Sequence, residues 1–553
     1  MRRQSSHSEQ HRSTVTVGHY DRRGRKRGQG DTMNAGRICL VLLALVLLAV
    51  SPTKGKKVLL IGFPFTSHMN ELMAVGRELV SKGHQVYAIM DVNKLGEKRF
   101  QGTGLKFLTY DSLDKEQKAI EEVEEKWPEI CFRTQTTSIK AMMDALASII
   151  QPIGTYECSR MLSDDKLLQQ IRDVNFDISL LDAIYYCSYL IPFKLDIPYV
   201  SMGSFNHVWK SRLHPVASHQ PCKIERDNSF TNRLKHFFLG MIVEHNLPDL
   251  FMDQSKFLDY DTPRPYSSLS ELVEKSSLFL INQNTVGSCA APSTPNVIYV
   301  GGLTNKPAKP LNVEYSQIVA EARDGVIVMS FGSGMSKMPK EFVRKFMWAF
   351  AQIKQVVIWR LKTTYDLEVP PNVNIVDWMP QNDLLADDRV QLFITHCGNN
   401  GQYEAIYHGV PMIGSPLYGD QADNAARMVH KGYGLQIQIA SFTAEELLEK
   451  INEVIRNPKY RANMKIASKI HKSLPDPIRQ SVYWIEHVME HGDGHLRTVL
   501  SEMSPTEFLM FDIFAVLFVL LGVVAFLLKL LLCFVYRKLS GSGSLSDRSK
   551  KQN

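Results

Sequence analysis

The chain has 553 residues, 44% of them hydrophobic, which is long enough for two ordinary domains, each with a core of its own. Its net charge of +7 is concentrated at the two ends: residues 1–37 carry +6 and residues 537–553 carry +4, which leaves the central part at −3. Binding to nucleic acid requires a basic face, so this charge distribution excludes a nucleic-acid partner.

The eight cysteines are scattered along the chain, without a CxxC pair or a zinc-like spacing. This pattern argues against a metal or redox centre, and we expect neither a metal ion nor a cofactor. Scattered cysteines in a chain of this size are usually buried as small hydrophobic side chains. The composition is compatible with one disulfide if the protein lies in an oxidising compartment, but the sequence does not indicate which cysteines would pair.

An apolar run of about a dozen residues, Ile38–Val50, lies near the start of the chain and follows Arg37. It is too short to cross a bilayer core of about 30 Å but has the length of the apolar region of a signal peptide. We therefore predict that residues 1–55 form a leader and signal peptide, with Met33 as the working start. A retained, disordered leader is the alternative.

A second apolar run, residues 513–535, is interrupted only by Lys529 and is long enough to cross the bilayer as a helix. The positive tail that follows, residues 536–553, is typical of a cytoplasmic flank. Its Lys550 and Lys551 resemble a dilysine retrieval signal of the endoplasmic reticulum, although generic basic tails are also common. The sequence thus predicts a single-pass, type I protein of the endoplasmic reticulum membrane, with its main body in the lumen.

Between these ends, short apolar runs alternate with stretches of helical spacing. The run 57–63 (KVLLIGF) is followed by a turn and by the helical pattern of residues 71–83. Further apolar runs that we expect to form strands lie at 176–186, 197–203, 324–334, 355–361, 373–380, 390–398 and 410–416. Such alternation predicts parallel sheets and an α/β fold.

A segment rich in Pro, Lys and Asn, residues 301–312, divides the body of the chain. We predict two Rossmann-like domains that face a cleft, an N-terminal domain at 56–300 and a C-terminal domain at 313–495, with 301–312 as the linker. In such sheets, ligands bind at the carboxyl ends of the strands.

The most specific motif is a strand-to-helix turn with His396, Gly398 and Gly401. Small residues allow close backbone approach there, and the first amides of the following helix would face an anion such as a diphosphate. Glu404 lies inside that helix, where its carboxylate is suited to accept hydrogen bonds from a ribose diol.

Flanking residues suit the other parts of a nucleotide sugar. Asp420 and Gln421 are adjacent hydrogen-bonding groups for the hydroxyls of a hexose, while Trp378 and Gln381 offer an aromatic plane and an amide to a uracil. Each residue alone has an ordinary structural explanation, such as packing or a solvated helix face. Their joint spacing is what favours a binding site.

With these residues in place, the sequence resembles the UDP-glycosyltransferase family of membrane-bound, inverting sugar transferases, from Lys57 to the tail. The resemblance implies a fold of the GT-B type and a UDP-sugar as co-substrate. One departure is Cys397, where the family usually has Gly or Ala. The family signature matches Trp378, Pro380, Gln381, His396, Gly398, Asn400, Gly401, Glu404, Pro416, Asp420 and Gln421.

The resemblance also implies a catalytic pair. His68, expected in the loop after the first strand, matches the family's base, and Asp182, at the end of another apolar run, matches the aspartate that orients it. The charge that develops on the leaving UDP would be absorbed by His396, Asn400 and helix amides, with help from Ser333 in a turn after a strand.

Several alternatives stay open at this point. The triplet Asp259–Tyr260–Asp261 matches the manganese motif of a different glycosyltransferase fold, but a surface loop is favoured because no phosphate turn lies near it in sequence. A catalytically weak UDP-sugar-binding protein of the same fold is the main competing function. A hydrolase is disfavoured because no G-x-S-x-G nucleophile motif is present.

The substrates are less well defined than the reaction. The donor sugar, hexose or glucuronate, is not distinguished by the signature. The aromatic and Met-rich segment 235–245 suggests a small lipophilic acceptor with a hydroxyl group, and an ordinary core or membrane-adjacent helix explains that segment equally well. Whether the chain forms a homo-oligomer is also open.

Overall fold

The computed structural model describes residues 55–542, except for the stretches 112–124, 133–150, 205–226, 239–251 and 258–265 and the short gaps 64–65, 98–99, 127, 152–153, 228, 236, 267, 291 and 336. The predicted leader up to Lys54, the basic tail after Ser542, the Asp259–Asp261 triplet and most of segment 235–245 therefore lie outside the described residues.

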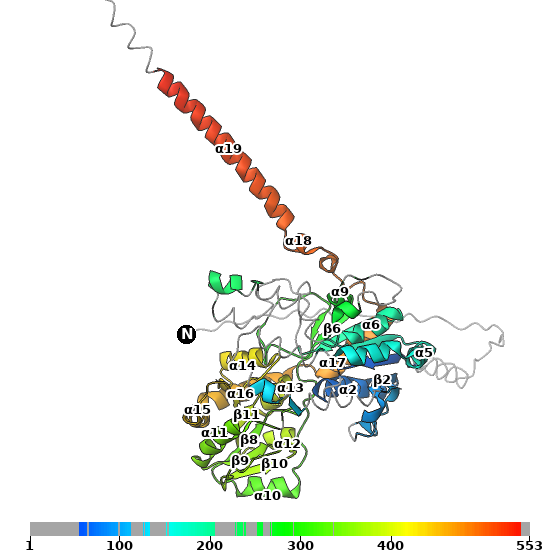
Figure 1. Ribbon diagram of the computed structural model, residues 1–553, viewed down its shortest axis with the longest axis vertical. Helices are drawn as coiled ribbons and strands as arrows, with labels where there is room; N and C mark the ends of the chain where they lie inside the picture. Colours follow the sequence, from blue (N-terminus) through cyan, green and yellow to red (C-terminus); the bar gives the residue numbers. More distant parts are fainter. Residues whose placement is uncertain are drawn as a thin grey trace, which may run out of the picture. The chain divides into compact units, whose positions relative to one another are not determined.

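The described chain alternates strands and helices (Figure 1). The strands of the first sheet are β1 (Lys57–Ile61), β2 (Gln85–Asp91), β3 (Lys106–Tyr110), β4 (Ile178–Asp182), β5 (Tyr199–Gly203), β6 (Leu278–Ile281) and β7 (Val297–Tyr299). The strands of the second are β8 (Val326–Ser330), β9 (Val356–Arg360), β10 (Val373–Val376), β11 (Val390–Thr395), β12 (Met412–Gly414) and β13 (Gly434–Gln436). The α-helices are α2 (Thr66–Ser81), α5 (Asp165–Val174), α6 (Cys187–Lys194), α9 (Leu269–Glu274), α10 (Val313–Glu321), α11 (Lys340–Ala351), α12 (Gln381–Leu385), α13 (Asn399–His408), α14 (Gln421–His430), α15 (Ala444–Arg456), α16 (Pro458–Ser473), α17 (Pro477–His491), α18 (Pro505–Phe508) and α19 (Phe511–Ser542).

Both sheets are parallel and wound in the same way. The first has the order β3-β2-β1-β4-β5-β6-β7 and the second β10-β9-β8-β11-β12-β13. The order reverses between β1 and β4 in one sheet and between β8 and β11 in the other, and these reversals are where ligands bind in open α/β sheets. The inner strands β4 and β8 are buried along their whole length, because helices cover both faces. The predicted α/β fold with two Rossmann-like halves is confirmed.

Helix α2 follows β1 and carries the first of the predicted catalytic residues. Its apolar residues recur at helical spacing, and Leu72, Val75 and Leu79 are buried against the sheet. Gly76 lets the helix lie close to β1, since a Cβ there would come within 2.8 Å of a methyl group of Leu60. The expectation that His68 lies in a loop is wrong, because α2 already begins at Thr66 and places His68 in its first turn.

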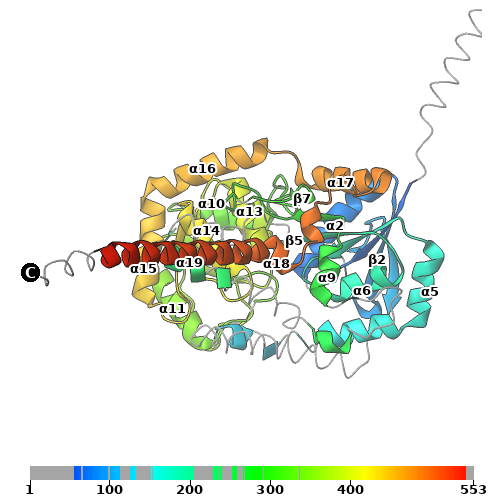
Figure 2. The same cartoon turned by 90° about the horizontal axis from the view of Figure 1, so that it is seen from above.

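Helix α17 returns to the first sheet, although it belongs to the stretch 313–495. Its Val482, Ile485 and Val488 share a hydrophobic cluster with residues of α2 and β1, and Figures 1 and 2 both draw α17 beside α2. Just after the end of α2, Nε2 of His84 lies 3.0 Å from Oε1 of Glu486 on α17. The chain therefore passes between the two halves twice, once through 301–312 and once before α17.

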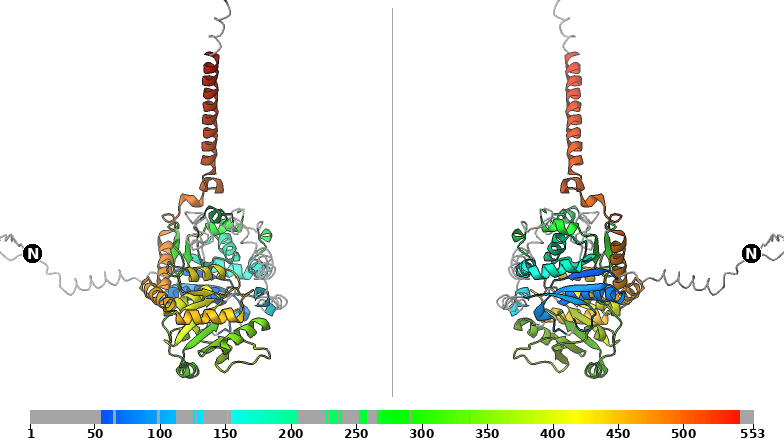
Figure 3. Two further views of the ribbon diagram at one scale, coloured as in Figure 1. Left: turned by 90° about the vertical axis from the view of Figure 1, so that its left-hand side faces the viewer. Right: turned by 90° about the vertical axis from the view of Figure 1, so that its right-hand side faces the viewer.

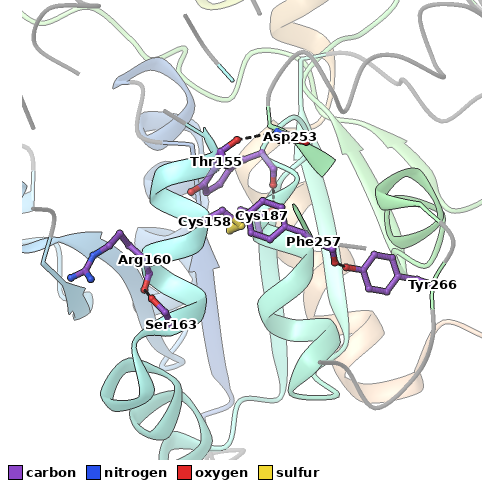
Figure 4. Close-up of a disulfide and its surroundings, with 10 residues drawn as sticks. Thr155, Cys158, Arg160, Ser163, Cys187, Asp253, Phe257 and Tyr266 are labelled. Carbon is purple, nitrogen blue, oxygen red and sulfur yellow. Dashed lines mark hydrogen bonds between the residues drawn. A yellow bond between two sulfur atoms is a disulfide. The ribbon is translucent and has the colours of Figure 1, made fainter. Parts of the chain in front are cut away.

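A disulfide joins Cys158, in a helix at 154–163, to Cys187 at the start of α6 (Figure 4). The pairing that the sequence left open is thus settled for these two residues, and it fits an oxidising compartment. Cys131 and Cys397 are free and buried, as expected of small hydrophobic side chains.

Helix α19 (red in Figure 3) contains the predicted membrane segment. Its residues Phe511–Ser540 have a mean hydropathy of 2.9 and none of the most apolar window is buried within the protein. A helix of 30 residues with apolar side chains on every face is long enough to cross a bilayer.

Candidate active site

A cleft of about 420 Å³ lies at the carboxyl ends of strands from both sheets. It brings together eleven of the twelve predicted site residues, namely His68, Ser333, Trp378, Gln381, His396, Gly398, Asn400, Gly401, Glu404, Asp420 and Gln421. The twelfth, Asp182, is 2% exposed and lies behind His68. Segments more than 300 residues apart in sequence thus meet in one cavity, as the reversal points of the two sheets require.

The predicted catalytic pair is in direct contact. Nδ1 of His68 lies 2.8 Å from Oδ2 of Asp182, the last residue of β4. Two backbone N–H groups also donate to this carboxylate, that of Phe63 to Oδ2 at 3.3 Å and that of Ile184 to Oδ1 at 3.1 Å. Because Nδ1–H donates to Asp182, Nε2 is the nitrogen left to accept a proton.

The electrostatics of this pair favour the imidazolium. Burial alone would lower the pKa of His68, but the charge and hydrogen bond of Asp182, with smaller contributions from Glu71 and Asp420, raise it to about 9. The pair therefore strongly stabilises the protonated form of the His68 ring. A general base is in this form after it has taken a proton.

The turn between β11 and α13 is built around His396. Its ring packs so closely that a Cβ at Gly398 or at Gly332 would lie 2.6 or 2.8 Å from Nε2, so glycine is required at both positions. Burial lowers the pKa of His396 to about 4, which keeps the imidazole neutral at pH 7. No side chain caps α13 at Gly398, so the first amides of the helix can face an anion in the cleft.

Cys397 occupies the one position where the sequence departs from the family pattern. Its φ is +66°, a backbone conformation that favours glycine. The thiol does not line the cleft; it is buried on the opposite side of the turn, where a Cβ on Gly414 would come within 2.3 Å of its sulfur. Burial raises the pKa of this thiol to about 12, so it stays protonated and unreactive at neutral pH.

At one end of the cleft, Nε2 of Gln381 donates to Oε2 of Glu404 at 2.6 Å. Burial raises the pKa of Glu404 to about 7. Trp378, 67% exposed, presents its ring at the same end. An aromatic plane, an amide and a carboxylate are thus adjacent, a set suited to a base and a ribose diol.

At the other end, Gln421 begins α14 and Asp420 directly precedes it. Nδ2 of Asn424 donates to Oδ2 of Asp420 at 2.8 Å, and burial raises the pKa of that carboxyl. Oε1 of Gln421 accepts backbone N–H groups from Leu417 and Tyr418 at 2.9 and 3.1 Å. The Gln421 oxygen is therefore committed to the loop, which leaves its NH₂ as the group for a ligand. Ser333 lies exposed in the turn after β8, on the wall of the cleft.

Glu71, Thr304 and Arg360 are among the residues of the cleft that the sequence does not predict. Glu71 follows His68 by one helical turn and would have been found had the start of α2 been placed at Thr66. Thr304 comes from the linker and Arg360 from the end of β9, where its guanidinium donates to the carbonyls of Gly332 and Asp377. No local pattern marks either of these two.

The family model described as "UDP-glucoronosyl and UDP-glucosyl transferase" matches residues 56–544. The chain belongs to this family. This UDP-glycosyltransferase is 34% identical to UDP-glucuronosyltransferase 2C1 of Oryctolagus cuniculus over 71% of its own length and 80% of the relative's. It is 31% identical to UDP-glucuronosyltransferase 2B14 of the same organism over 92% and 98% of the two chains.

Solved glycosyltransferases share the fold of this UDP-glycosyltransferase. The spinosyn forosaminyltransferase SpnP matches 79% of the chain and all of its own, with a TM-score of 0.54 and 17% identity. A UDP-glucosyltransferase from Polygonum tinctorium matches 79% of the chain and 99% of its own, with a TM-score of 0.53 and 14% identity. The fold is thus of the GT-B type, and the enzyme is a glycosyltransferase with a UDP-sugar donor.

Proposed function

We propose that this enzyme transfers a hexosyl or glucuronosyl group from a UDP-sugar to a hydroxyl of a small lipophilic acceptor, with inversion at the anomeric carbon. The single observation that carries the proposal is the contact of 2.8 Å between His68 and Asp182 in a cleft that also contains the open N-terminus of α13.

In the proposed reaction, Nε2 of His68 takes the proton of the acceptor hydroxyl, and Asp182 orients the ring and stabilises the imidazolium. The acceptor oxygen forms a bond to the anomeric carbon as the bond from that carbon to the UDP oxygen breaks, so the electron pair leaves with UDP. Hydrogen bonds from the α13 amides and from neutral His396, Asn400 and Ser333 would absorb the developing charge. This arrangement requires no metal ion, and we expect chelators to leave the activity unchanged.

The donor would lie along the cleft in one direction. Its uracil would stack on Trp378 near Gln381, its ribose would bind Glu404, and its diphosphate would meet the turn of Gly398 and Gly401. The sugar hydroxyls would then reach Asp420 and Gln421, on the side of the cleft where His68 lies. The names of the relatives favour glucuronate as the sugar, whereas the structural neighbour from Polygonum tinctorium is named for glucose.

We further propose that α19 anchors the enzyme in the endoplasmic reticulum membrane, with the cleft in the lumen. The disulfide Cys158–Cys187 supports this side of the membrane, because such bonds persist in oxidising compartments. An acceptor that partitions into the bilayer would then be concentrated near the enzyme.

Membranes that contain the full chain test the proposal. They should release UDP from a panel of UDP-sugars when given a phenolic or a lipid acceptor, with the glycoside detected by mass spectrometry. His68→Ala should abolish the product. His84→Ala is the matched control, because His84 also pairs with a carboxylate but lies outside the cleft. If His68→Ala still forms product, His68 is not the base. If the wild-type enzyme binds a UDP-sugar but forms no product with any acceptor, the alternative function of a catalytically weak UDP-sugar-binding protein is favoured.

A further inference from the structure

A third carboxyl group lies beside the catalytic pair. Glu71 is three residues after His68 on α2, so both side chains lie on the same face of the helix. Glu71 is 5% exposed and contributes to the wall of the cleft. An almost fully buried carboxyl group is costly unless hydrogen bonds satisfy it, so its partners indicate what it does.

The partner of Glu71 comes from the other half of the protein. Nδ2 of Asn400, in the first turn of α13, donates to Oε1 of Glu71 at 2.9 Å. The same amide is fixed at its oxygen, which accepts from Oγ1 of Thr304 at 3.1 Å and from Nδ2 of Asn282 at 3.3 Å. With both ends of the amide held, Asn400 has one orientation, and Glu71 determines the direction of its NH₂ group.

The charges around Glu71 connect it to the base as well. Burial raises its pKa to about 7, while His68 and the hydrogen bonds from Asn400 and Asn282 oppose the shift and Asp182 adds to it. In turn, His68 faces Asp182, Glu71 and Asp420, and each of these raises the pKa of the imidazole. A change at Glu71 is therefore felt both by Asn400 and by His68.

We propose that Glu71 is a positioning residue that ties helix α2, which carries His68, to the first turn of α13, and so holds the base in register with the diphosphate turn. The inference rests on the proposed function, because it assigns Glu71 a task in the transfer carried out by His68. A buried polar contact that only stabilises the fold would not link kcat or its pH dependence to Glu71.

Steady-state kinetics of the full-length enzyme in membranes test this role. Glu71→Ala should lower kcat about ten-fold, equivalent to about 1.4 kcal/mol, with a smaller change in the KM of the UDP-sugar. Glu71→Gln keeps an oxygen that accepts from Asn400, so its kcat should stay within about three-fold of the wild type. Because the amide has no charge, the rising limb of kcat/KM for Glu71→Gln should move to lower pH.

A double-mutant cycle isolates the contact with Asn400. If the contact positions the base, Glu71→Ala combined with Asn400→Ala should be no slower than Asn400→Ala alone, whereas independent roles would multiply the two losses. Glu78→Gln, on the same helix but outside the cleft, is the control and should behave as the wild type.

Thermal unfolding of each variant shows whether it is folded. If Glu71→Ala does not fold, the pH profile of Glu71→Gln still decides. An unchanged kcat in Glu71→Ala, multiplied losses in the cycle or an unshifted profile in Glu71→Gln would overturn the role of Glu71. These outcomes differ from failure of the proposed function, in which His68→Ala itself would remain active.

Discussion

Nδ1 of His68 and Oδ2 of Asp182 lie 2.8 Å apart, although the two residues are more than 100 positions apart in the sequence. The contact is possible because β1 and β4 are neighbours at the point where the strand order reverses. Asp182 ends β4, and α2 begins shortly after β1 at the same edge of the sheet, so the carboxylate can orient the ring of His68.

The first prediction concerns pH. A base acts only when it is deprotonated, and the pKa of His68 is about 9, so kcat/KM should rise with pH from 6, reach half its maximum near pH 9 and level off above that pH. Asp182→Asn removes the charge that raises this pKa. The rising limb should then move to lower pH, and kcat should fall roughly 10²- to 10⁴-fold as the ring loses its orientation. If the rising limb of kcat/KM stays at the same pH in Asp182→Asn, the assignment of this limb to His68 is contradicted.

The second prediction concerns the donor. The pKa of Glu404 is about 7, and its carboxylate accepts hydrogen bonds from both hydroxyls of a ribose diol most strongly when ionised, because protonation turns one of its oxygens into a donor. The Kd of a UDP-hexose should therefore rise as the pH falls below 7 and should be lower above pH 7. Glu404→Gln should raise this Kd about ten-fold at pH 8, or about 1.4 kcal/mol, and remove its pH dependence. Isothermal titration calorimetry measures both effects, with Glu445→Gln on the exposed face of α15 as the control.

The third prediction tests the packing of Cys397. Gly414→Ala would bring a Cβ within 2.3 Å of the Cys397 sulfur, and overpacking of this kind costs about 1–3 kcal/mol in the free energy of unfolding. Adding Cys397→Gly removes the clash and also suits the φ of +66°. The double variant should thus be more stable than Gly414→Ala alone in thermal unfolding. Equal stability of these two variants would show that another contact limits Gly414.

The fourth prediction concerns the membrane. An enzyme truncated after residue 504 lacks the apolar helix α19 and should leave the membrane pellet after alkaline carbonate extraction, whereas the full chain should stay in it. Substituting Lys529 by Leu, which keeps the helix apolar, should leave the full chain in the pellet. A truncated enzyme that still pellets would indicate a second membrane contact.

The sequence predicted those parts of the site that depend on local chemistry. The turn at His396 was recognisable because small residues, a strand and a helix occur there in a fixed order. The first turn of α2 is not evident from the sequence because Thr66, Ser67 and Asn70 are residue types that favour caps and turns over a helix interior. Glu71 was missed with it.

Contacts between segments far apart in the chain could not be predicted from the sequence, for a physical reason. The amphipathic pattern of α17 shows that Val482 and Ile485 are buried, but a pattern within one helix does not specify the surface against which they pack. The same holds for Cys158 and Cys187, whose sulfur atoms meet only because the helix at 154–163 lies beside α6.

The return of α17 to α2 has a consequence for protein engineering. A chimaera made by exchanging everything after residue 312 between two family members would import an α17 whose Val482, Ile485 and Val488 have been matched to a different α2. The recombined enzyme would then have a defective core beneath the helix that carries His68. Helices α2 and α17 should therefore be exchanged as a single cassette, with the crossover points placed in 301–312 and again just before Pro477.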